Sequence, residues 1–151
     1  MTAHSPETEH RKAWMSLLAK TPAERLTALW EATSLSPDHE ILRAPEVGAV
    51  MVRGRAGATG APFNLGEMSV VRCSVRLACG TVGHGYVQGR DKEHARLAAL
   101  VDALMQTRDA ARLRADLLTP LEAELTQART ARQARAAATK VDFFTLVRGE
   151  D

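Results

Sequence analysis

The sequence predicts an α+β protein: an antiparallel meander of about four strands, flanked by N-terminal and C-terminal helices and followed by an extended C-terminal tail. Three observations lead to this prediction. Apolar residues recur at helical spacing in the N-terminal and C-terminal thirds, the middle alternates with a period of two, and the last dozen residues turn apolar again. The length of 151 residues fits a single domain, within which we expect residues 1–10 to be flexible and 139–151 to dock.

Two helices are expected first. Ser5-Pro6 reads as an N-cap with proline at the first helical position, and apolar residues at helical spacing follow through Leu18. Thr21-Pro22-Ala23-Glu24 reads as a second start with a capping box, ahead of an apolar side that includes Leu26 and Trp30. The turn at residues 36–38 should end this helix.

The middle of the chain reads as strands. We expect an extended segment from Ile41 to Arg53, a glycine-rich loop over residues 56–62 and a strand over Glu67–Leu77. A hairpin turn at Cys79-Gly80 should lead into a further strand over residues 81–88. Alternation predicts one apolar and one polar face for this sheet.

The two cysteines, Cys73 and Cys79, are predicted to lie on the same apolar face of one strand stretch. Their separation of about 20 Å along a strand is too long for a disulfide. We therefore expect two buried thiols in a reducing compartment.

Helices should return at Asp91. The spacing of Leu97, Leu100, Val101 and Leu104 is that of a helix laid on a core. A second capping box is read at Thr119-Pro120-Leu121-Glu122.

Composition narrows the function. The chain is 45% hydrophobic and 25% charged, and its net charge of +2 is too small for bulk electrostatics to be its function. It has no apolar signal core and no apolar stretch near the ~18 residues of a membrane span, so we expect a cytoplasmic protein without membrane contact. Because aromatics are only 4%, the arginines at 129, 132 and 135 favour solvent or a protein partner over nucleic acid.

The best site candidate is the glycine-rich turn into the helix that begins near Asp91. Gly89 permits close backbone approach, while Arg90 and Lys92 add positive charge at a helix N-terminus, where anions bind. Asp91 is expected to cap this helix and to fill the anion position itself. A bound phosphate, a partner's carboxylate and a purely structural turn remain open readings.

Two other segments are candidates for contact. Arg53 and Arg55 precede the glycine-rich loop and could grip an anion, although a solvated or partner-ordered loop fits equally. The C-terminal tail carries Phe143, Phe144 and Arg148, and with Tyr86 it is expected to form a docking surface. An apolar tail left in water would promote aggregation, so it should dock on its own sheet or on another chain.

No residue pattern supplies a nucleophile, a general base or a metal site. The serines lack a nucleophile-elbow context, and the histidines lack the spacing and the cysteine partners of a metal site. This profile favours an interaction subunit over a free-standing enzyme.

Six blocks of the sequence also resemble the PhnG family: Trp14-Met15-Ser16, Glu46–Met51, Gly60–Glu67, Gly85–Lys92, Ala99–Met105 and Val141–Gly149. The blocks run from about residue 11 to the end of the chain, and the last block and Val87-Gln-Gly-Arg-Asp-Lys92 are distinctive in combination.

The resemblance implies a subunit of the carbon–phosphorus lyase core complex. Its partners would be subunits of the PhnI, PhnH, PhnJ and PhnL types. With PhnI, PhnH and PhnL, such a subunit is linked to making α-D-ribose 1-methylphosphonate 5-triphosphate and adenine from ATP and methylphosphonate. In the family the chemistry is assigned to other subunits, so no catalytic residue and no cofactor is carried over to this chain. The isolated chain is expected to self-associate. The alternative is a phosphate- or nucleotide-binding accessory protein that uses the Gly89–Lys92 helix start.

Overall fold

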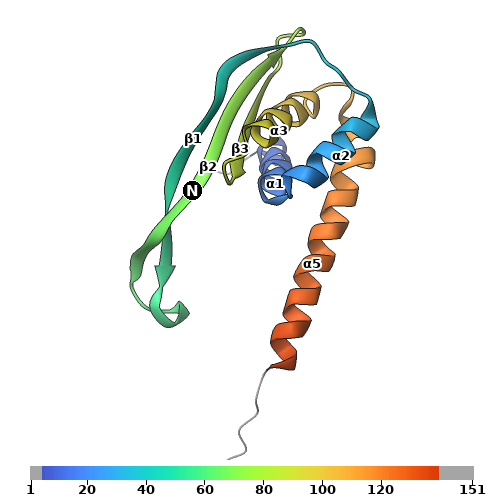
Figure 1. Cartoon of the computed structure of the whole chain (residues 1–151). Helices are drawn as coiled ribbons and strands as arrows, with labels where there is room; N and C mark the ends of the chain where they lie inside the picture. The colour runs from blue at the N-terminus through green and yellow to red at the C-terminus, as the bar shows by residue number, and fades with distance from the viewer. Residues whose placement is uncertain (1–4, 140–151) are drawn as a thin grey trace, which may run out of the picture.

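The structure, a computed structural model, describes residues 5–139 and confirms the α+β class. Two N-terminal helices precede a three-stranded antiparallel sheet, and a helical region that ends in the long helix α5 follows it (Figure 1). The elements are α1 (Pro6–Lys20), α2 (Ala23–Thr33), β1 (His39–Arg55), η1 (Ala56–Ala58), β2 (Pro62–Leu77), β3 (Val82–Gln88), α3 (Lys92–Leu104), α4 (Ala110–Leu113), η2 (Arg114–Leu118) and α5 (Thr119–Ala138).

The sheet within the described residues has three strands in the order β1-β2-β3, not about four. The expected number of strands was therefore too high: the segment that contains Ile41 and Arg53 is one long strand, with register shifts at three places. Bulges of this kind bend and twist a strand without ending it. The glycine-rich loop lies where it was expected, over residues 56–61, but β2 begins at Pro62, earlier than the predicted start at Glu67.

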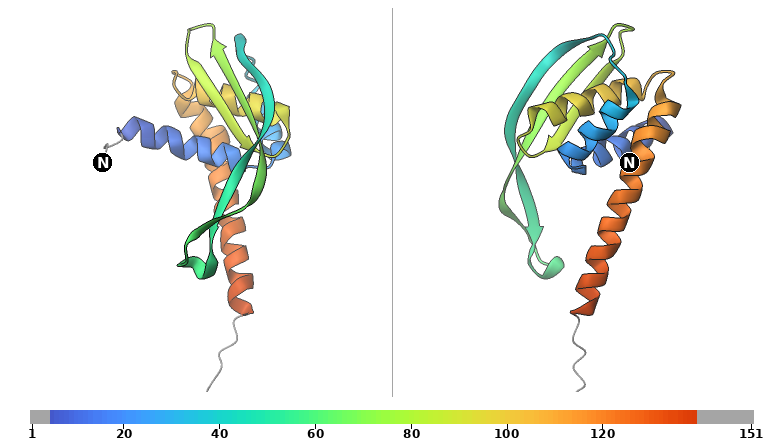
Figure 2. Two further views of the ribbon diagram at one scale, coloured as in Figure 1. Left: turned by 90° about the vertical axis from the view of Figure 1, so that its left-hand side faces the viewer. Right: turned by 45° about the vertical axis from the view of Figure 1, so that its right-hand side comes forward.

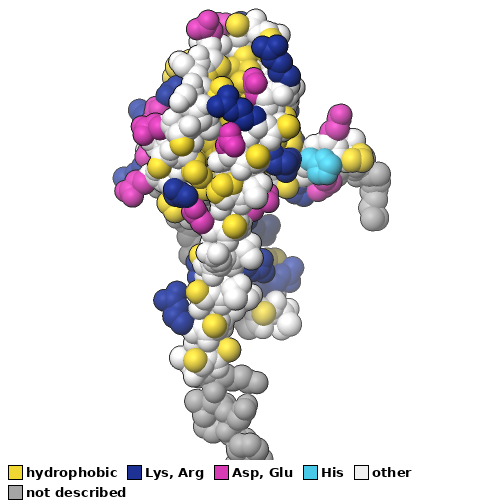
Figure 3. Space-filling model, turned by 90° about the vertical axis from the view of Figure 1, so that its right-hand side faces the viewer, with side chains coloured by type: hydrophobic (Ala, Val, Ile, Leu, Met, Phe, Trp, Pro, Cys, Tyr) yellow, Lys and Arg dark blue, Asp and Glu magenta, His cyan; other side chains and the backbone are white. Residues whose placement is uncertain are grey.

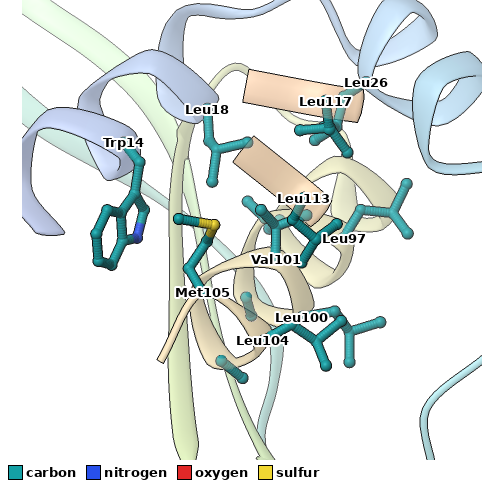
Figure 4. Packing of buried hydrophobic residues seen from close by; sticks show 14 of the residues in the cluster. Trp14, Leu18, Leu26, Leu97, Leu100, Val101, Leu104, Met105, Leu113 and Leu117 are labelled. Atoms are coloured by element: carbon teal, nitrogen blue, oxygen red, sulfur yellow. The ribbon is translucent and has the colours of Figure 1, made fainter. Parts of the chain in front are cut away.

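Helix α3 covers one face of the sheet and forms the centre of the core. Ten of its residues are buried, and they pack with apolar residues of α1, α2 and the chain after α3 (Figure 4). Gly83 and Gly85 of β3 let the helix approach very closely, because a Cβ at either position would overlap α3 backbone atoms. The buried labelled residues are Trp14, Leu18, Leu26, Leu97, Leu100, Val101, Leu104, Met105, Leu113 and Leu117.

Two of the four predicted helix starts have the expected cap. Ser5 Oγ accepts a hydrogen bond from the Thr8 N–H at 3.4 Å, and Asp91 caps α3. The Thr21 box is wrong: its hydroxyl donates to the Leu17 carbonyl and so ends α1 instead of capping α2. The box at Thr119 is wrong as well, because this hydroxyl donates to the Arg114 carbonyl inside a continuing helix.

The C-terminal helix projects from the body. Its apolar anchors, Leu113, Leu117, Leu118 and Leu121, are buried across α4, the π-helical turn η2 and the first turn of α5. Every described residue of α5 after Leu121 is exposed, and the helix runs away from the other elements (Figures 1 and 2). No helix within residues 5–139 is long and apolar enough to cross a membrane.

Candidate protein interaction site

A two-stranded hairpin projects from the sheet in the same general direction as α5 (Figure 1). We call residues 48–66 the hairpin arm; they comprise the ends of β1 and β2 and the turn between them. Pairing of β2 with β3 begins only at Val70, so within residues 5–139 no third strand supports the arm (Figure 1). An isolated two-stranded hairpin is marginally stable in water. The arm therefore has the geometry of an element that is completed by another protein.

The arm exposes large apolar side chains. Met51 is 51% exposed, Phe63 45% and Leu65 66%. Leu65 falls at a register shift, because Val52 pairs with Gly66 and Arg53 with Asn64. Sequence reasoning missed this surface, although the alternation of Phe63 and Leu65 with smaller residues marked a strand. Exposed apolar groups gathered on one projection are typical of a protein interaction site.

The hairpin arm and the exposed part of α5 are both basic. Residues 48–66 of the arm and residues 125–138 of α5 together hold five arginines, at positions 53, 55, 129, 132 and 135, and no acidic residue. All five arginines are exposed, and Figure 3 shows basic side chains along the projecting lower part of the molecule. Arg55 also braces the turn of the arm, since its guanidinium donates to the Gly60 carbonyl at 3.1 Å. Arg53 and Arg55 thus lie at the end of β1 next to the apolar surface of the arm, and their role in binding an anion or a partner remains a prediction.

The turn into α3 is built as the sequence predicts. Gly89 has φ +106°, a conformation that favours glycine. The Asp91 carboxylate accepts hydrogen bonds from the N–H groups of Glu93 at 2.9 Å and His94 at 3.0 Å. These are donors that an external anion would need. Arg90 and Lys92 are exposed beside the turn, so their role in binding an anion or a partner remains a prediction.

Asp102 forms a buried polar cluster that sequence reasoning missed. Its carboxylate is fully buried and accepts bonds from the Arg11 guanidinium at 3.1 and 2.7 Å, the Trp14 indole at 2.9 Å and the His84 N–H at 2.8 Å. The only signal in the sequence is one acidic residue within an apolar helical pattern. With all its bonds made inside the protein, Asp102 joins α1, α3 and β3 and offers no reactive group.

Ser74 and His84 form a pair on the open face of the sheet. Ser74 Oγ and His84 Nδ1 are 2.9 Å apart, which is within the reach of a nucleophile and its base. Within residues 5–139, however, no carboxylate bonds the His84 ring. Ser74 also lies in the middle of a strand, without the turn that presents a nucleophile. The pair is a cross-strand contact, and we assign it no catalysis.

The cysteines differ from the prediction. Cys73 is buried, and this burial raises the pKa of its thiol. Cys79 is exposed, because β2 ends at Leu77 and Cys79 lies in the turn to β3. The hydrogen bond with the Thr81 hydroxyl lowers the pKa of Cys79. Only one of the two is therefore the buried thiol that was expected.

Of the remaining predicted site residues, one lies within the part of the chain that the structure describes and three lie outside it. Tyr86 is 44% exposed on β3, the edge strand opposite β1. Phe143, Phe144 and Arg148 lie outside the described residues. Among residues 5–139 there is no group of three or more side chains that could hold a metal ion.

Comparison with known proteins gives two concordant matches. The family described as "Phosphonate metabolism protein PhnG" matches residues 9–149. The chain is also similar to the "Alpha-D-ribose 1-methylphosphonate 5-triphosphate synthase subunit PhnG" of Rhizobium meliloti (strain 1021). The two sequences are 46% identical over 151 residues, which cover 99% of this chain and 96% of the relative.

Proposed function

Since the chain belongs to the PhnG family of phosphonate metabolism proteins, we propose that it is a non-catalytic subunit of the carbon–phosphorus lyase core complex. In this role it supports the transfer of methylphosphonate to the ribose of ATP, which yields α-D-ribose 1-methylphosphonate 5-triphosphate and adenine. The relative that is similar along its whole length is named as a subunit of that synthase.

The observation that carries the proposal is the hairpin arm. Its exposed apolar residues belong to a two-stranded ribbon that has no third strand among the residues that the structure describes. Such a surface fits a subunit whose fold is completed on assembly, since obligate interfaces resemble a domain core cut in half. Partners of the PhnI, PhnH, PhnJ and PhnL types are part of the proposal, and the arm is the surface that we assign to one of them.

A nucleotide-binding role for the Gly89–Lys92 turn is the weaker candidate. The Asp91 carboxylate already bonds two N–H groups at the start of α3 and places a negative charge where a phosphate would lie. No observation in the described residues favours this role over subunit contact.

Co-expression tests the proposal. The chain is produced with PhnI-, PhnH- and PhnL-type subunits, and co-elution and adenine release from ATP with methylphosphonate are measured. Leu65→Asp should lower the affinity between the subunits by about 30-fold or more, because a charge in the centre of an interface costs ~2 kcal/mol or more. Co-elution should fall accordingly. Adenine release should fall in parallel with complex formation.

A matched control is available on the same strand pair. Leu42 is 45% exposed on β1 but lies outside the arm, so Leu42→Asp introduces the same charge and should leave assembly intact. Equal co-elution of the Leu65→Asp variant and the wild type would remove the arm from the interface. Adenine release by the chain alone would overturn the non-catalytic role.

A further inference from the structure

The outer edge of β3 offers unpaired backbone groups. In an antiparallel pair, successive residues direct their N–H and C=O groups alternately toward and away from the neighbouring strand. The His84 N–H points away from β2, since it donates to Asp102. By alternation, the backbone N–H and C=O groups of Tyr86 and Gln88 also point away from β2. No other residue in the 5–139 region bonds the Tyr86 backbone groups.

At the N-terminal end of β3, the outward backbone groups already have hydrogen-bond partners. The Val82 carbonyl accepts bonds from Arg11 at 3.4 Å and Gln106 at 3.0 Å, and Asp102 takes the His84 N–H. These bonds end the free stretch at His84, and the edge from there to Gln88 remains open. An additional strand at this edge would therefore pair over the last residues of β3 only.

Helix α1 provides a platform beside the open stretch. Its N-terminal half extends past the β3 edge with no strand above it, as the left view of Figure 2 shows. A groove of about 450 Å³ runs along this helix, and the atoms exposed in it are almost all carbon. Met15 and Ala19 line it on α1, and Tyr86 lines it on β3. The β3 edge and the groove together form a surface that fits a short, partly apolar fourth strand.

The opposite edge of the sheet is a poorer template. Strand β1 has register shifts at three places and carries Pro45, and bulges and proline are devices that oppose strand addition. Strand β3 pairs with β2 without a register shift. The regular edge is therefore the one that can accept another strand.

The chain itself contains a segment whose composition suits such a strand. Residues 141–147, Val-Asp-Phe-Phe-Thr-Leu-Val, combine β-branched and aromatic residues, which are enriched in strands. They begin three residues after Ala138, the last residue of α5. Their apolar side chains match the apolar groove beside Tyr86.

The direction of α5, which runs away from the other elements (Figures 1 and 2), favours the groove of another copy over the chain's own groove. From Thr126 to Ala138, α5 rises about 20 Å away from the body at ~1.5 Å per residue. An extended chain needs about six residues to retrace that distance at ~3.3 Å per residue. Residues 139–144 would be needed to span the distance back along α5. Phe143 and Phe144 would then lie outside the groove.

We propose that residues 141–147 of a second copy of this chain add as a strand to β3 at Tyr86, and that two copies exchange their tails reciprocally. Reciprocal exchange closes the contact as a two-fold dimer instead of an open chain. This inference concerns the chain without partners, so it stands or falls separately from its role in phosphonate metabolism.

Sedimentation of the purified full chain gives the first test. Wild type should sediment as a dimer of twice 16.4 kDa. Tyr86→Pro removes the outward N–H at a position where proline costs no ladder bond, so it should give monomers. Tyr86→Ala is the matched control: it keeps the N–H and should dimerise more strongly than Tyr86→Pro.

Mixing provides the sharper test. The double variant Phe143→Asp/Phe144→Asp has an altered tail but an intact β3 edge, and it should also be monomeric. Tyr86→Pro has an intact tail and a blocked edge. Mixed together, the two variants should form a heterodimer with one working junction, which neither forms alone.

Three outcomes would overturn the proposal. The first is a monomeric wild type at about 100 μM, where even a low-micromolar Kd gives mostly dimer. The second is a mixture of folded variants that stays monomeric. The third is a dimer that both altered variants retain. Because the tail variant keeps residues 5–139 unchanged, the test does not depend on the folding of Tyr86→Pro alone.

Discussion

Gly85 of β3 lies so close to Ala95 of α3 that a Cβ built on the glycine would stand 2.0 Å from the Ala95 carbonyl oxygen. The neighbouring contact at Gly83 is similar, with 2.1 Å to the Ala99 carbonyl oxygen. Backbone atoms of a buried helix cannot turn aside as a flexible side chain can. The distance between the helix and the sheet is therefore set by the missing side chains of two glycines.

Gly85→Ala is expected to destabilise the protein strongly. The added methyl must displace α3, and overpacking of a core costs about 1–3 kcal/mol or more. Urea unfolding followed by circular dichroism measures the change. Gly48→Ala is the control, because a Cβ there meets nothing within 4 Å. A Gly85→Ala protein as stable as Gly48→Ala would show that the helix can shift freely.

Asp102→Ala should also cost stability, by about 3–5 kcal/mol, because it leaves the Trp14 indole and the His84 N–H without their buried acceptor. Arg11 is partly exposed and can recover some of its loss in water. Asp116→Ala, which breaks the exposed pair with Arg112, should cost less than about 1 kcal/mol. Comparable unfolding midpoints for the two variants would contradict a structural role for the buried cluster.

The thiols should react in a fixed order. Alkylation of the native protein should modify Cys79, which is exposed and has a lowered pKa, while Cys73 should react only on unfolding. A lowered pKa places the rise of the Cys79 rate at lower pH, since the thiolate is the nucleophile. Thr81→Val removes the hydroxyl beside Sγ and should move this rise to higher pH. Mass spectrometry across a pH series gives the rates, and an unchanged profile would exclude Thr81 as the cause.

Local signals predicted much of the fold. Helix α3 and its Asp91 cap follow from the apolar spacing and one side chain, and the turn between β2 and β3 follows from Cys79-Gly80. The capping boxes failed because a threonine hydroxyl can bond backward to a carbonyl as readily as forward to an N–H. Thr21 and Thr119 both do so, and only the path of the preceding helix decides which bond forms.

The interaction surface was harder to predict. Met51, Phe63 and Leu65 look like ordinary strand residues, and their exposure depends on how far β3 extends beside β2. Asp102 was missed for a related reason, since its donors come from Arg11, Trp14 and His84, which are distant in sequence. Pairing between remote segments is not encoded in local periodicity.

The hairpin arm has a consequence for the cell that makes this protein. Nothing in residues 5–139 covers Phe63 and Leu65, so a copy without a partner is expected to keep them in water. Exposed apolar β-hairpins are bound by chaperones and cleaved by proteases, and they promote precipitation. Surplus copies should therefore be short-lived, and balanced synthesis of this chain and its neighbours becomes a condition for keeping it in solution.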